Sequence, residues 1–459
     1  MNNFSIADIP KGANIHMIGI GGISMSGIAE MLLNFGYKVS GSDTKSSGLT
    51  DRLKQNGAEI FIGQKAENIK SPDVVCYTAA ISEDNPELMA AKQLGVPVVE
   101  RAVMLGALLK LYKYPVAVAG THGKTTTSSM LSLVLLSAQK DPTILIGGEL
   151  RQIGGNYRIG GSEYLPFEAC EYVESFLHFK PFVSIVTNIE EDHLDYFKDL
   201  NHIISSFVEF TSLTNSNGCN IVCIDENSTK NIVQNVEKNC ITYGLKNEEA
   251  DYTARNIKLR KNGCPSFDIF NKEKMICHVD LNVHGEHNVC NAVGVAAACD
   301  YLGIEPEYIK QGLEEFTGTK RRFELLGKAE TGADVVDDYA HHPTEINATI
   351  KAAKEMNYKN VWVVFQPHTY TRTAAFLDEF AETLSAADRV IIADIYAARE
   401  INDGTVHSKD IADRIPDAKY IGDMKEIESY LLQNTEADDL IITMGAGDIC
   451  NLGYALTKS

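Results

Sequence analysis

The chain has 459 residues, 44% of them hydrophobic and 23% charged, which are the proportions of an ordinary globular protein with ample core. Its formal net charge of −20 argues against nucleic-acid binding, because phosphates require a basic patch. No apolar run approaches the ~20 residues of a membrane helix, and Met1-Asn-Asn-Phe does not start a signal peptide. The cysteines form no CxxC pair, so we expect a cytoplasmic chain with reduced thiols that meets neither nucleic acid nor a membrane.

A glycine-rich turn near the amino terminus is the first functional signal along the chain. A strand predicted at 14–18 leads into Gly19-Ile-Gly-Gly-Ile-Ser-Met-Ser-Gly27, and a helix follows to Phe35. The next strand, from Tyr37 to Ser40, leads to Asp43, which is the order of a dinucleotide fingerprint with Ser24 in the third glycine position. Helices predicted at 49–55 and 86–94 alternate with strands at 60–62, 73–77 and 96–99. We expect a Rossmann-like domain that binds a phosphate-bearing ligand, and then a linker at 110–115.

A second phosphate-binding signal lies between a short apolar strand, Val116–Ala119, and a helix predicted from Thr125 to Ser137. The connecting sequence is Gly120-Thr-His-Gly-Lys-Thr125. Its glycines let backbone N–H groups surround phosphate oxygens at a helix amino terminus. Lys124 would reach the β- and γ-phosphates, and the Thr125 hydroxyl would bind Mg²⁺. Although the loop is shorter than GxxxxGK[ST], we interpret it as a nucleotide-binding loop rather than an ordinary strand–helix turn.

Two further segments carry polar groups whose role the residues alone leave open. The strand predicted at 182–187 runs into Asn188-Ile-Glu-Glu-Asp-His193, whose carboxylates and imidazole could hold a divalent ion or form a solvated acidic loop. Gly285-Glu-His-Asn288 opens a helix of small residues to Cys299, and its amides could read a flat ring or cap the helix. Residues 219–282 indicate only short β-like pieces.

From about residue 323 strands and helices alternate again, and four predicted strands end in polar residues. These strands are 335–338, 361–365, 389–393 and 440–443. Because the carboxyl ends of parallel strands meet at one edge, we expect these groups to form one rim of a sheet. A metal site made by Asp337, Asp338, His341 and His342 is the less favoured alternative, and a helix is predicted to begin at Pro343.

In this order and spacing, the motifs resemble the Mur ligases of peptidoglycan synthesis over nearly the whole chain. The segments that carry the resemblance are 19–27, 120–125, 187–193, 285–288, 338–344 and 365–368. The short phosphate loop is the family's own form. The resemblance implies an α/β fold of three domains. These are a Rossmann-like UDP-binding domain at 1–108, a central P-loop-type ATPase domain with a parallel sheet at 109–320, and a Rossmann-like, amino-acid-binding domain at 321–459.

The resemblance also implies an ATP- and Mg²⁺-dependent ligase that joins L-alanine to the carboxylate of UDP-N-acetylmuramate through an acyl phosphate. It further implies that the protein is a monomer or a weak homodimer. Three alternatives stay open: ligation of a tripeptide to the same sugar nucleotide, an NAD-dependent oxidoreductase, and a non-catalytic nucleotide-binding regulator. The oxidoreductase would leave the second phosphate loop without a purpose. The regulator would not explain why Lys124, Glu171 and His193 are all present.

Site residues are carried over from the family motif by motif. The expected catalytic residues are Lys124, Glu171, His193, Arg322, His341 and Arg372. The expected ATP contacts are Gly120, Thr121, His122, Gly123, Lys124, Thr125, Thr126, Asn288, Asn291 and Asp338. The expected substrate contacts are Gly21, Gly22, Ser24, Asp43, Ala80, Ile81, Tyr339 and Tyr370. The expected Mg²⁺ ligands are Thr125, Glu171 and His193.

Two departures from the family pattern bear on these expectations. Val173 stands where an aspartate is common after Glu171, so we expect altered support of that carboxylate rather than loss of metal binding. Thr369 replaces an arginine found in many relatives. Since no lysine lies between Lys198 and Lys230, we do not expect the carbamylated lysine of later ligases in the pathway.

Overall fold

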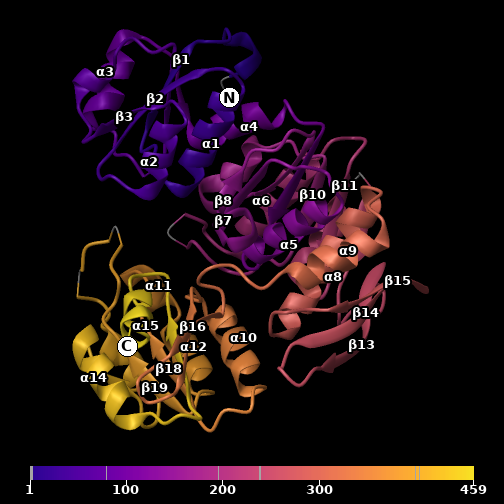
Figure 1. Cartoon of the computed structure of the whole chain (residues 1–459), viewed down its shortest axis with the longest axis vertical. Coiled ribbons are helices and arrows are strands. Elements are labelled where there is room, and N and C mark those ends of the chain that lie inside the picture. Colours follow the sequence, from indigo (N-terminus) through magenta and orange to yellow (C-terminus); the bar gives the residue numbers. More distant parts are fainter. Residues whose placement is uncertain are drawn as a thin grey trace. The chain divides into compact units, whose positions relative to one another are not determined.

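The computed structural model describes residues 4–78, 80–194, 196–236, 239–398, 400–402 and 404–458. The chain forms two compact units (Figure 1). The first comprises residues 1–190, 201–243 and 297–312, and the second comprises 191–200, 244–296 and 313–459. Within the described residues, no helix combines the length and the apolar character needed to cross a membrane.

The first sheet of the first unit is parallel and has the strand order β3-β2-β1-β4-β5. Its strands are β1 (Asn14–Ile18), β2 (Lys38–Asp43), β3 (Glu59–Ile62), β4 (Val74–Tyr77) and β5 (Val98–Glu100). The helices beside it are η1 (Ile6–Asp8), α1 (Ile23–Asn34), α2 (Gly48–Gln55), η2 (Ala66–Asn68), α3 (Pro86–Leu94) and α4 (Arg101–Leu109). The strand order reverses at β1, between β2 and β4, which is where open α/β sheets bind ligands.

The central sheet of the first unit includes β12-β11-β10-β6-β9-β7-β8. Its strands are β6 (Tyr114–Ala119), β7 (Ile144–Leu150), β8 (Gly155–Arg158), β9 (Tyr164–Glu168), β10 (Val183–Val186), β11 (Cys219–Cys223) and β12 (Cys240–Tyr243). The helices are α5 (Lys124–Ser137), η3 (Arg151–Ile153), η4 (Tyr172–His178), α6 (Leu200–Ser212), α7 (Asn227–Asn235) and α9 (Pro306–Glu315). Strand β6 is buried from Pro115 to Ala119 and lies between β10 and β9, so the loop after it opens at the middle of the sheet.

Helix α1 of the amino-terminal sheet packs directly on β7 and β8 of the central sheet (Figure 1). Tyr157 donates its hydroxyl to Glu30 at 3.0 Å, and Asn156 donates to the Ile23 carbonyl at 2.9 Å. A Cβ on Gly27 would lie 2.7 Å from the end of the Leu145 side chain, so the helix packs closely on the strands at this glycine. These contacts explain why the first two sheets belong to one compact unit. The predicted division at residues 108 and 320 stays a prediction.

The second unit contains an antiparallel meander and the carboxy-terminal sheet. The meander consists of β13 (Tyr252–Leu259), β14 (Pro265–Asn271) and β15 (Lys274–Asp280), and α8 (Glu286–Tyr301) begins after it. The other sheet has the order β16-β17-β21-β18-β19-β20, in which only β16 is antiparallel to its neighbour. Its strands are β16 (Glu324–Lys328), β17 (Asp334–Asp338), β18 (Val361–Phe365), β19 (Arg389–Ile392), β20 (Lys419–Tyr420) and β21 (Leu440–Met444).

Successive side chains of the carboxy-terminal strands point to opposite faces of the sheet and pack into two hydrophobic cores, one on each face. On β18, Val363 and Phe365 pack with α10 (Pro343–Lys354), α12 (Leu377–Leu384) and α13 (Ser408–Ala412). Trp362 and Val364 pack with α14 (Met424–Asn434) and α15 (Cys450–Leu456) on the other face. The short helix α11 (Tyr370–Ala375) follows β18. Since β17, β21, β18 and β19 are parallel neighbours, their carboxyl ends form the predicted single rim.

The predicted elements agree with the structure except near their ends and at chain reversals. Pro115 lies inside β6, where it pairs with Leu165, so the linker is shorter than predicted and spans residues 110–113. Strand β2 begins at Lys38, because the Tyr37 N–H still donates to the Leu32 carbonyl of α1 at 3.0 Å. No sequence pattern indicated β16 or the β7–β8 pair, since the formation of a strand depends strongly on the packing that it finds in the sheet.

Candidate functional site

The glycine turn after β1 lies at the carboxyl edge of the first sheet, as predicted. The backbone N–H of Gly21 donates to the Asp43 carboxylate at 2.9 Å, and a Cβ on Gly21 would lie 2.8 Å from the same oxygen. A Cβ on Gly19 would lie 2.9 Å from Thr78 at the end of β4. The structure therefore brings the predicted residues Gly21, Gly22, Ser24, Asp43, Ala80 and Ile81 to one edge.

Arg101 is a residue of this edge that the sequence analysis missed. It opens α4 directly after β5, and its guanidinium donates to the Ser24 hydroxyl at 2.9 Å. A cation therefore lies beside the glycine turn. The only sequence signal was a basic residue at the end of a strand, and spacing alone does not reveal that it reaches back 77 residues.

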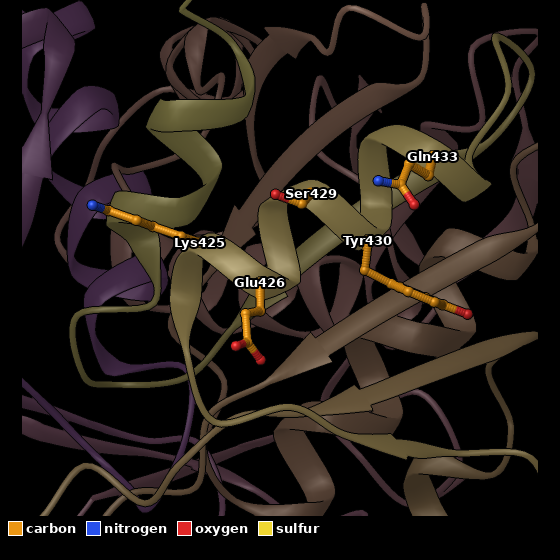
Figure 2. A pocket seen from close by; sticks show the side chains of 5 residues that line it. All are labelled: Lys425, Glu426, Ser429, Tyr430 and Gln433. Carbon is orange, nitrogen blue, oxygen red and sulfur yellow. The ribbon is translucent and has the colours of Figure 1, made fainter.

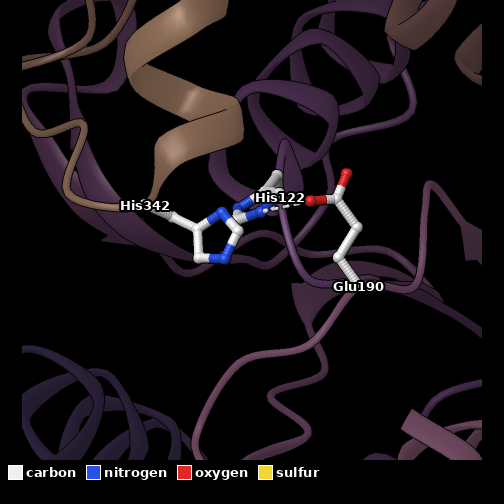
Figure 3. Close-up of side chains that lie close together, drawn as sticks. All are labelled: His122, Glu190 and His342. Atoms are coloured by element: carbon white, nitrogen blue, oxygen red, sulfur yellow. Dashed lines mark ion pairs between the residues drawn. The ribbon is translucent and has the colours of Figure 1, made fainter. Parts of the chain in front are cut away.

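The phosphate loop after β6 is held from the neighbouring strand β10. The Asn188 side chain accepts from the His122 N–H at 2.8 Å and donates to the His122 carbonyl at 3.0 Å. The Thr187 hydroxyl donates to the same carbonyl at 2.6 Å. His122 Nε2 lies 3.6 Å from the Glu190 carboxylate (Figure 3). The start of the 187–193 motif therefore fixes the loop, a role that the sequence analysis did not assign to it.

Lys124 turns back into its own loop and forms an ion pair with Glu171. Its ammonium lies 3.0 Å from both Glu171 oxygens and donates to the carbonyls of Gly120 and Thr121. Burial is the largest single influence and would lower the pKa of Lys124, but the charge and hydrogen bond of Glu171, with smaller contributions from Cys170 and Glu168, together raise the pKa above its ordinary value. Lys124 is therefore a fixed cation at neutral pH. In the same turn, Thr125 donates its hydroxyl to Glu168 at 3.2 Å.

The backbone just after Glu171 is strained at the position of the first family departure. Val173 has φ 47° and ψ 31°, and Glu174 has φ 55° and ψ 27°. A β-branched residue is an outlier in this left-handed region, which asparagine, aspartate and glycine adopt more readily. The valine therefore stands in a conformation that asparagine, aspartate or glycine would adopt with less strain.

We expect Val173→Asn to raise the free energy of unfolding by about 1 kcal/mol, because asparagine tolerates left-handed backbone. Val173→Ala is the matched control, since it shortens the side chain without relieving the backbone. Denaturant unfolding of the three proteins measures the difference. Equal stability of the Asn and Ala variants would contradict this explanation.

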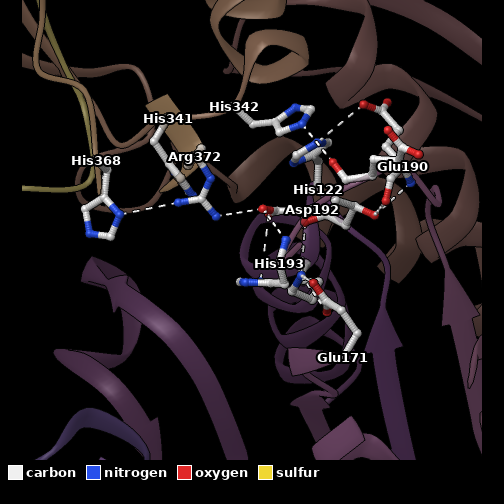
Figure 4. A network of polar contacts seen from close by, with 12 residues as sticks. His122, Glu171, Glu190, Asp192, His193, His341, His342, His368 and Arg372 are labelled. Atoms are coloured by element: carbon white, nitrogen blue, oxygen red, sulfur yellow. Dashed lines mark hydrogen bonds and ion pairs between the residues drawn. The ribbon is translucent and has the colours of Figure 1, made fainter. Parts of the chain in front are cut away.

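In the second unit, the predicted residues gather around Asp192. Arg372 donates to the Asp192 carboxylate at 2.6 Å and to His368 Nδ1 at 3.3 Å (Figure 4). The next residue, His193, has its Nε2 atom 3.8 Å from Asp192 and a positive φ of 54°. Burial would raise the pKa of Asp192, but the charges of His193 and Arg372 hold it well below its usual range. Arg372 is therefore anchored by a carboxylate that stays ionised.

The turn after β17 carries Asp338, Tyr339 and His341. The Asp338 carboxylate accepts from the N–H groups of Phe323 and Ala340 at 2.8 and 2.7 Å, and burial raises its pKa to about 6. Burial lowers the pKa of His341 to about 4, so this imidazole is neutral at pH 7. The Arg321 and Arg322 guanidinium groups lie 4.9 and 5.3 Å from the Tyr339 ring centre.

The alternative metal site at Asp337, Asp338, His341 and His342 is not supported, because these groups have separate partners. Asp337 accepts from Arg321 and Thr443. His341 contacts the Tyr339 carbonyl at 3.0 Å. His342 Nδ1 accepts from the Thr344 N–H at the start of α10, and His342 Nε2 lies 3.1 Å from the Glu191 carbonyl oxygen.

The remaining predicted residues lie at the starts of helices in the second unit. Asn288 in α8 donates to the His284 carbonyl at 2.7 Å and accepts from Asn291 at 3.3 Å. Tyr370 begins α11, and its N–H donates to Glu400 at 2.6 Å. Thr369, the second departure, has a φ of 66° and accepts the Arg372 N–H.

The structure thus divides the predicted residues between its two units. Lys124, Thr125, Glu171 and the UDP-sugar contacts lie in the first. The second contains His193, Asn288, Asn291, Arg322, Asp338, Tyr339, His341, Tyr370 and Arg372. A shallow pocket on the surface of α14, lined by Lys425, Glu426, Ser429, Tyr430 and Gln433, includes none of them (Figure 2).

Comparison with known proteins gives consistent matches along the chain. Family models match at residues 14–113 ("Mur ligase family, catalytic domain"), 118–299 ("Mur ligase middle domain") and 321–447 ("Mur ligase, glutamate ligase domain"). The UDP-N-acetylmuramate–L-alanine ligase of Acetivibrio thermocellus is 51% identical over 462 aligned residues, covering 100% of this chain and 98% of that protein.

Two solved structures match with similar coverage. The crystal structure of UDP-N-acetylmuramate-alanine ligase MurC from Thermotoga maritima has a TM-score of 0.81 and 31% identity, over 97% of this chain and 98% of that one. The murein peptide ligase mpl from Psychrobacter arcticus has a TM-score of 0.73 and 25% identity, over the same shares of the two chains. The predicted three-domain α/β fold class is confirmed.

Proposed function

The chain belongs to the Mur ligase family, and we propose that it joins L-alanine to the carboxylate of UDP-N-acetylmuramate at the expense of ATP. The observation that carries this proposal is 51% identity with an enzyme of that name over 100% of the chain. The resemblance inferred from the motifs is thereby confirmed. The murein peptide ligase, which represents the alternative acceptor, is only 25% identical.

The reaction needs activation, because joining a carboxylate to an amine in water is uphill. The muramoyl carboxylate attacks the γ-phosphorus of ATP, which gives an acyl phosphate and ADP. The neutral amine of alanine then attacks the acyl carbon, and phosphate leaves as the amide forms. Phosphoryl transfer depends mainly on positioning and on neutralisation of charge, and cationic groups stabilise the anionic tetrahedral intermediate of the second step.

In the first unit, we assign the phosphates of ATP to the loop of Gly120, Thr121, His122, Gly123, Lys124, Thr125 and Thr126. The fixed charge of Lys124 suits it to neutralise the γ-phosphate during transfer. At the carboxyl edge of the amino-terminal sheet, the glycine turn and Ser24 would hold the diphosphate of the sugar nucleotide. The Arg101 guanidinium, 2.9 Å from the Ser24 hydroxyl, would add a cation there.

The donor set beside the phosphate loop suits Mg²⁺, which prefers oxygen ligands. It consists of the Thr125 hydroxyl and the Glu171 carboxylate. His193, which belongs to the second unit, stays a ligand that the family resemblance predicts. When bound, Mg²⁺ neutralises phosphate charge during transfer. The Glu171 carboxylate contacts Lys124 through both oxygens, so a bound metal would share this carboxylate with the Lys124 ammonium.

In the second unit, Arg372 is suited to bind a carboxylate, because the Asp192 and His368 contacts fix its planar guanidinium. Neutral His341 would donate or accept a hydrogen bond without adding charge. Tyr339 and Tyr370 would line the same region, Asn288 and Asn291 would contact adenine, and Arg322 would bind phosphate. Cytoplasmic location stays a prediction.

The proposal is tested by measuring phosphate release from the purified chain with ATP, Mg²⁺ and UDP-N-acetylmuramate, with and without L-alanine. We expect sustained release only when all four are present. Release that does not depend on L-alanine would contradict the proposed reaction. Release without UDP-N-acetylmuramate would indicate a different acceptor for the γ-phosphate.

A further inference from the structure

Glu168 lies beside the phosphate loop and received no role from the sequence motifs. It is the last residue of β9, and β9 pairs with β6 so that Glu168 lies opposite Val118, two residues before the loop begins. Three donors converge on its carboxylate. The Thr125 hydroxyl donates to Oε2 at 3.2 Å. Oε1 accepts from the Ser128 hydroxyl at 3.3 Å and from the Gly147 N–H.

The position of this carboxylate is fixed from two sides. A Cβ on Gly147 would lie 2.6 Å from Oε2, so β7 can approach the carboxylate this closely only because residue 147 is glycine. Ser128 is fully buried in α5. One carboxylate oxygen is therefore occupied by a backbone donor that cannot reverse its direction. The other oxygen, Oε2, accepts from the Thr125 hydroxyl.

A hydroxyl that ligates a metal must offer a lone pair to the metal and direct its hydrogen elsewhere. We propose that Glu168 is a positioning residue that accepts the Thr125 hydrogen and so aims the Thr125 lone pair at Mg²⁺. This inference rests on the proposed function, which requires Mg²⁺ at Thr125. It extends that function by naming the group that orients the ligand.

The variant Glu168→Gln tests the direction of this hydrogen bond. The Gly147 N–H requires the amide oxygen on its side, so the amide NH₂ faces Thr125 and donates to it. The Thr125 hydroxyl then has to turn its hydrogen toward the metal position. The Ser128 hydroxyl contacts Oε1, the side on which the amide keeps its oxygen. It can therefore go on donating there or turn to the Thr125 carbonyl, 3.1 Å away, so the variant keeps its packing.

The experiment is a calorimetric titration of the full chain with ADP at several MgCl₂ concentrations. We expect Glu168→Gln to require about 10-fold more Mg²⁺ for half of the Mg²⁺-dependent gain in ADP affinity. ADP affinity without Mg²⁺ should stay within about 2-fold of wild type, which a general loss of structure would not allow. Glu163→Gln is the matched control, since Glu163 directly precedes the same strand and is 66% exposed.

A second arm places Glu168→Gln in the Thr125→Ala background. If Glu168 acts through Thr125, its effect on the Mg²⁺ requirement disappears there, because coupled residues are not additive. An undiminished effect would overturn the proposal and make Glu168 an independent ligand. Glu168→Asp is a second variant, to be used if the Gln variant folds poorly. It shortens the side chain by one methylene and should also raise the Mg²⁺ concentration needed for half of the gain in ADP affinity.

Wild-type Mg²⁺ curves in both the Gln and the Asp variants would also overturn the proposal. Failure of the proposed function looks different, because the wild-type chain itself would then show no Mg²⁺-dependent ADP binding. The two failures are therefore distinguished by the unmodified protein.

Discussion

Replacement of Lys124 by alanine is expected to lower ligation by about 100- to 1,000-fold, which is the usual cost of removing one preorganised group from a transition state. Lys124 is the fixed cation of the phosphate loop, held between two backbone carbonyls and Glu171. Its removal leaves the developing phosphate charge without a partner. UDP-N-acetylmuramate should still bind, since its proposed contacts lie on another sheet.

Turnover and UDP-sugar affinity of Lys124→Ala are measured side by side. The matched control is Lys113→Ala, which removes an exposed lysine paired with Glu163 at 3.9 Å in the same unit. Surface pairs of this kind contribute about 0–1 kcal/mol, so the control should keep its activity. If Lys124→Ala retains more than about a tenth of wild-type turnover, the assigned role of Lys124 is wrong.

Gly120→Ala should be as damaging, for a reason of backbone shape rather than charge. Gly120 has a φ of 141°, and a Cβ there would lie 2.0 Å from the Thr187 hydroxyl and 3.2 Å from backbone atoms of Asn188. The loop and the strand end that holds it would have to separate. A displacement of about 1 Å in a catalytic loop can cost roughly 100-fold in rate.

The expected result for Gly120→Ala is therefore loss of ATP affinity together with turnover. Gly48→Ala is the control, because Gly48 begins α2 without a positive φ and a Cβ there would meet open space. That variant should match wild type or be slightly more stable. Normal ATP binding by Gly120→Ala would mean that the loop adapts and that its fixed shape is unimportant.

The phosphate loop was predictable because its signal is local. An apolar strand, two glycines and Gly-Lys-Thr before a helix specify a phosphate site within about ten residues of sequence. The rim of the carboxy-terminal sheet was predictable for a similar reason, since the strands are parallel and each ends in polar residues. For these elements, short-range pattern and the geometry of parallel sheets were sufficient.

Contacts between distant segments were not predictable in this way. Asn188 forms hydrogen bonds with the N–H and the carbonyl of His122, which is 66 residues away in the sequence. Arg372 forms an ion pair with Asp192, which is 180 residues away. Arg101 and Glu168 were missed because a charged residue at the end of a strand has several possible partners. The packing of α1 on β7 and β8, which joins two sheets into one unit, brings Gly27 close to Leu145, and no local pattern distinguishes that glycine.

The most direct test of the central claim is a competition between amine acceptors. The full chain is given UDP-N-acetylmuramate, ATP and Mg²⁺ with equal concentrations of L-alanine, glycine, L-serine, L-valine and a tripeptide that begins with L-alanine, and products are identified by mass. A pocket built for one methyl group discriminates against glycine by only about 1–3 kcal/mol and rejects an added hydroxyl poorly. Glycine and serine should therefore give minor products, and valine should be excluded by its size.

The proposal predicts that the L-alanine product dominates. The tripeptide should fail, because its second residue would occupy the position where the alanine carboxylate meets a cation. If the tripeptide product dominates instead, the chain is a ligase of the same family with a different acceptor, and the assignment of L-alanine is wrong.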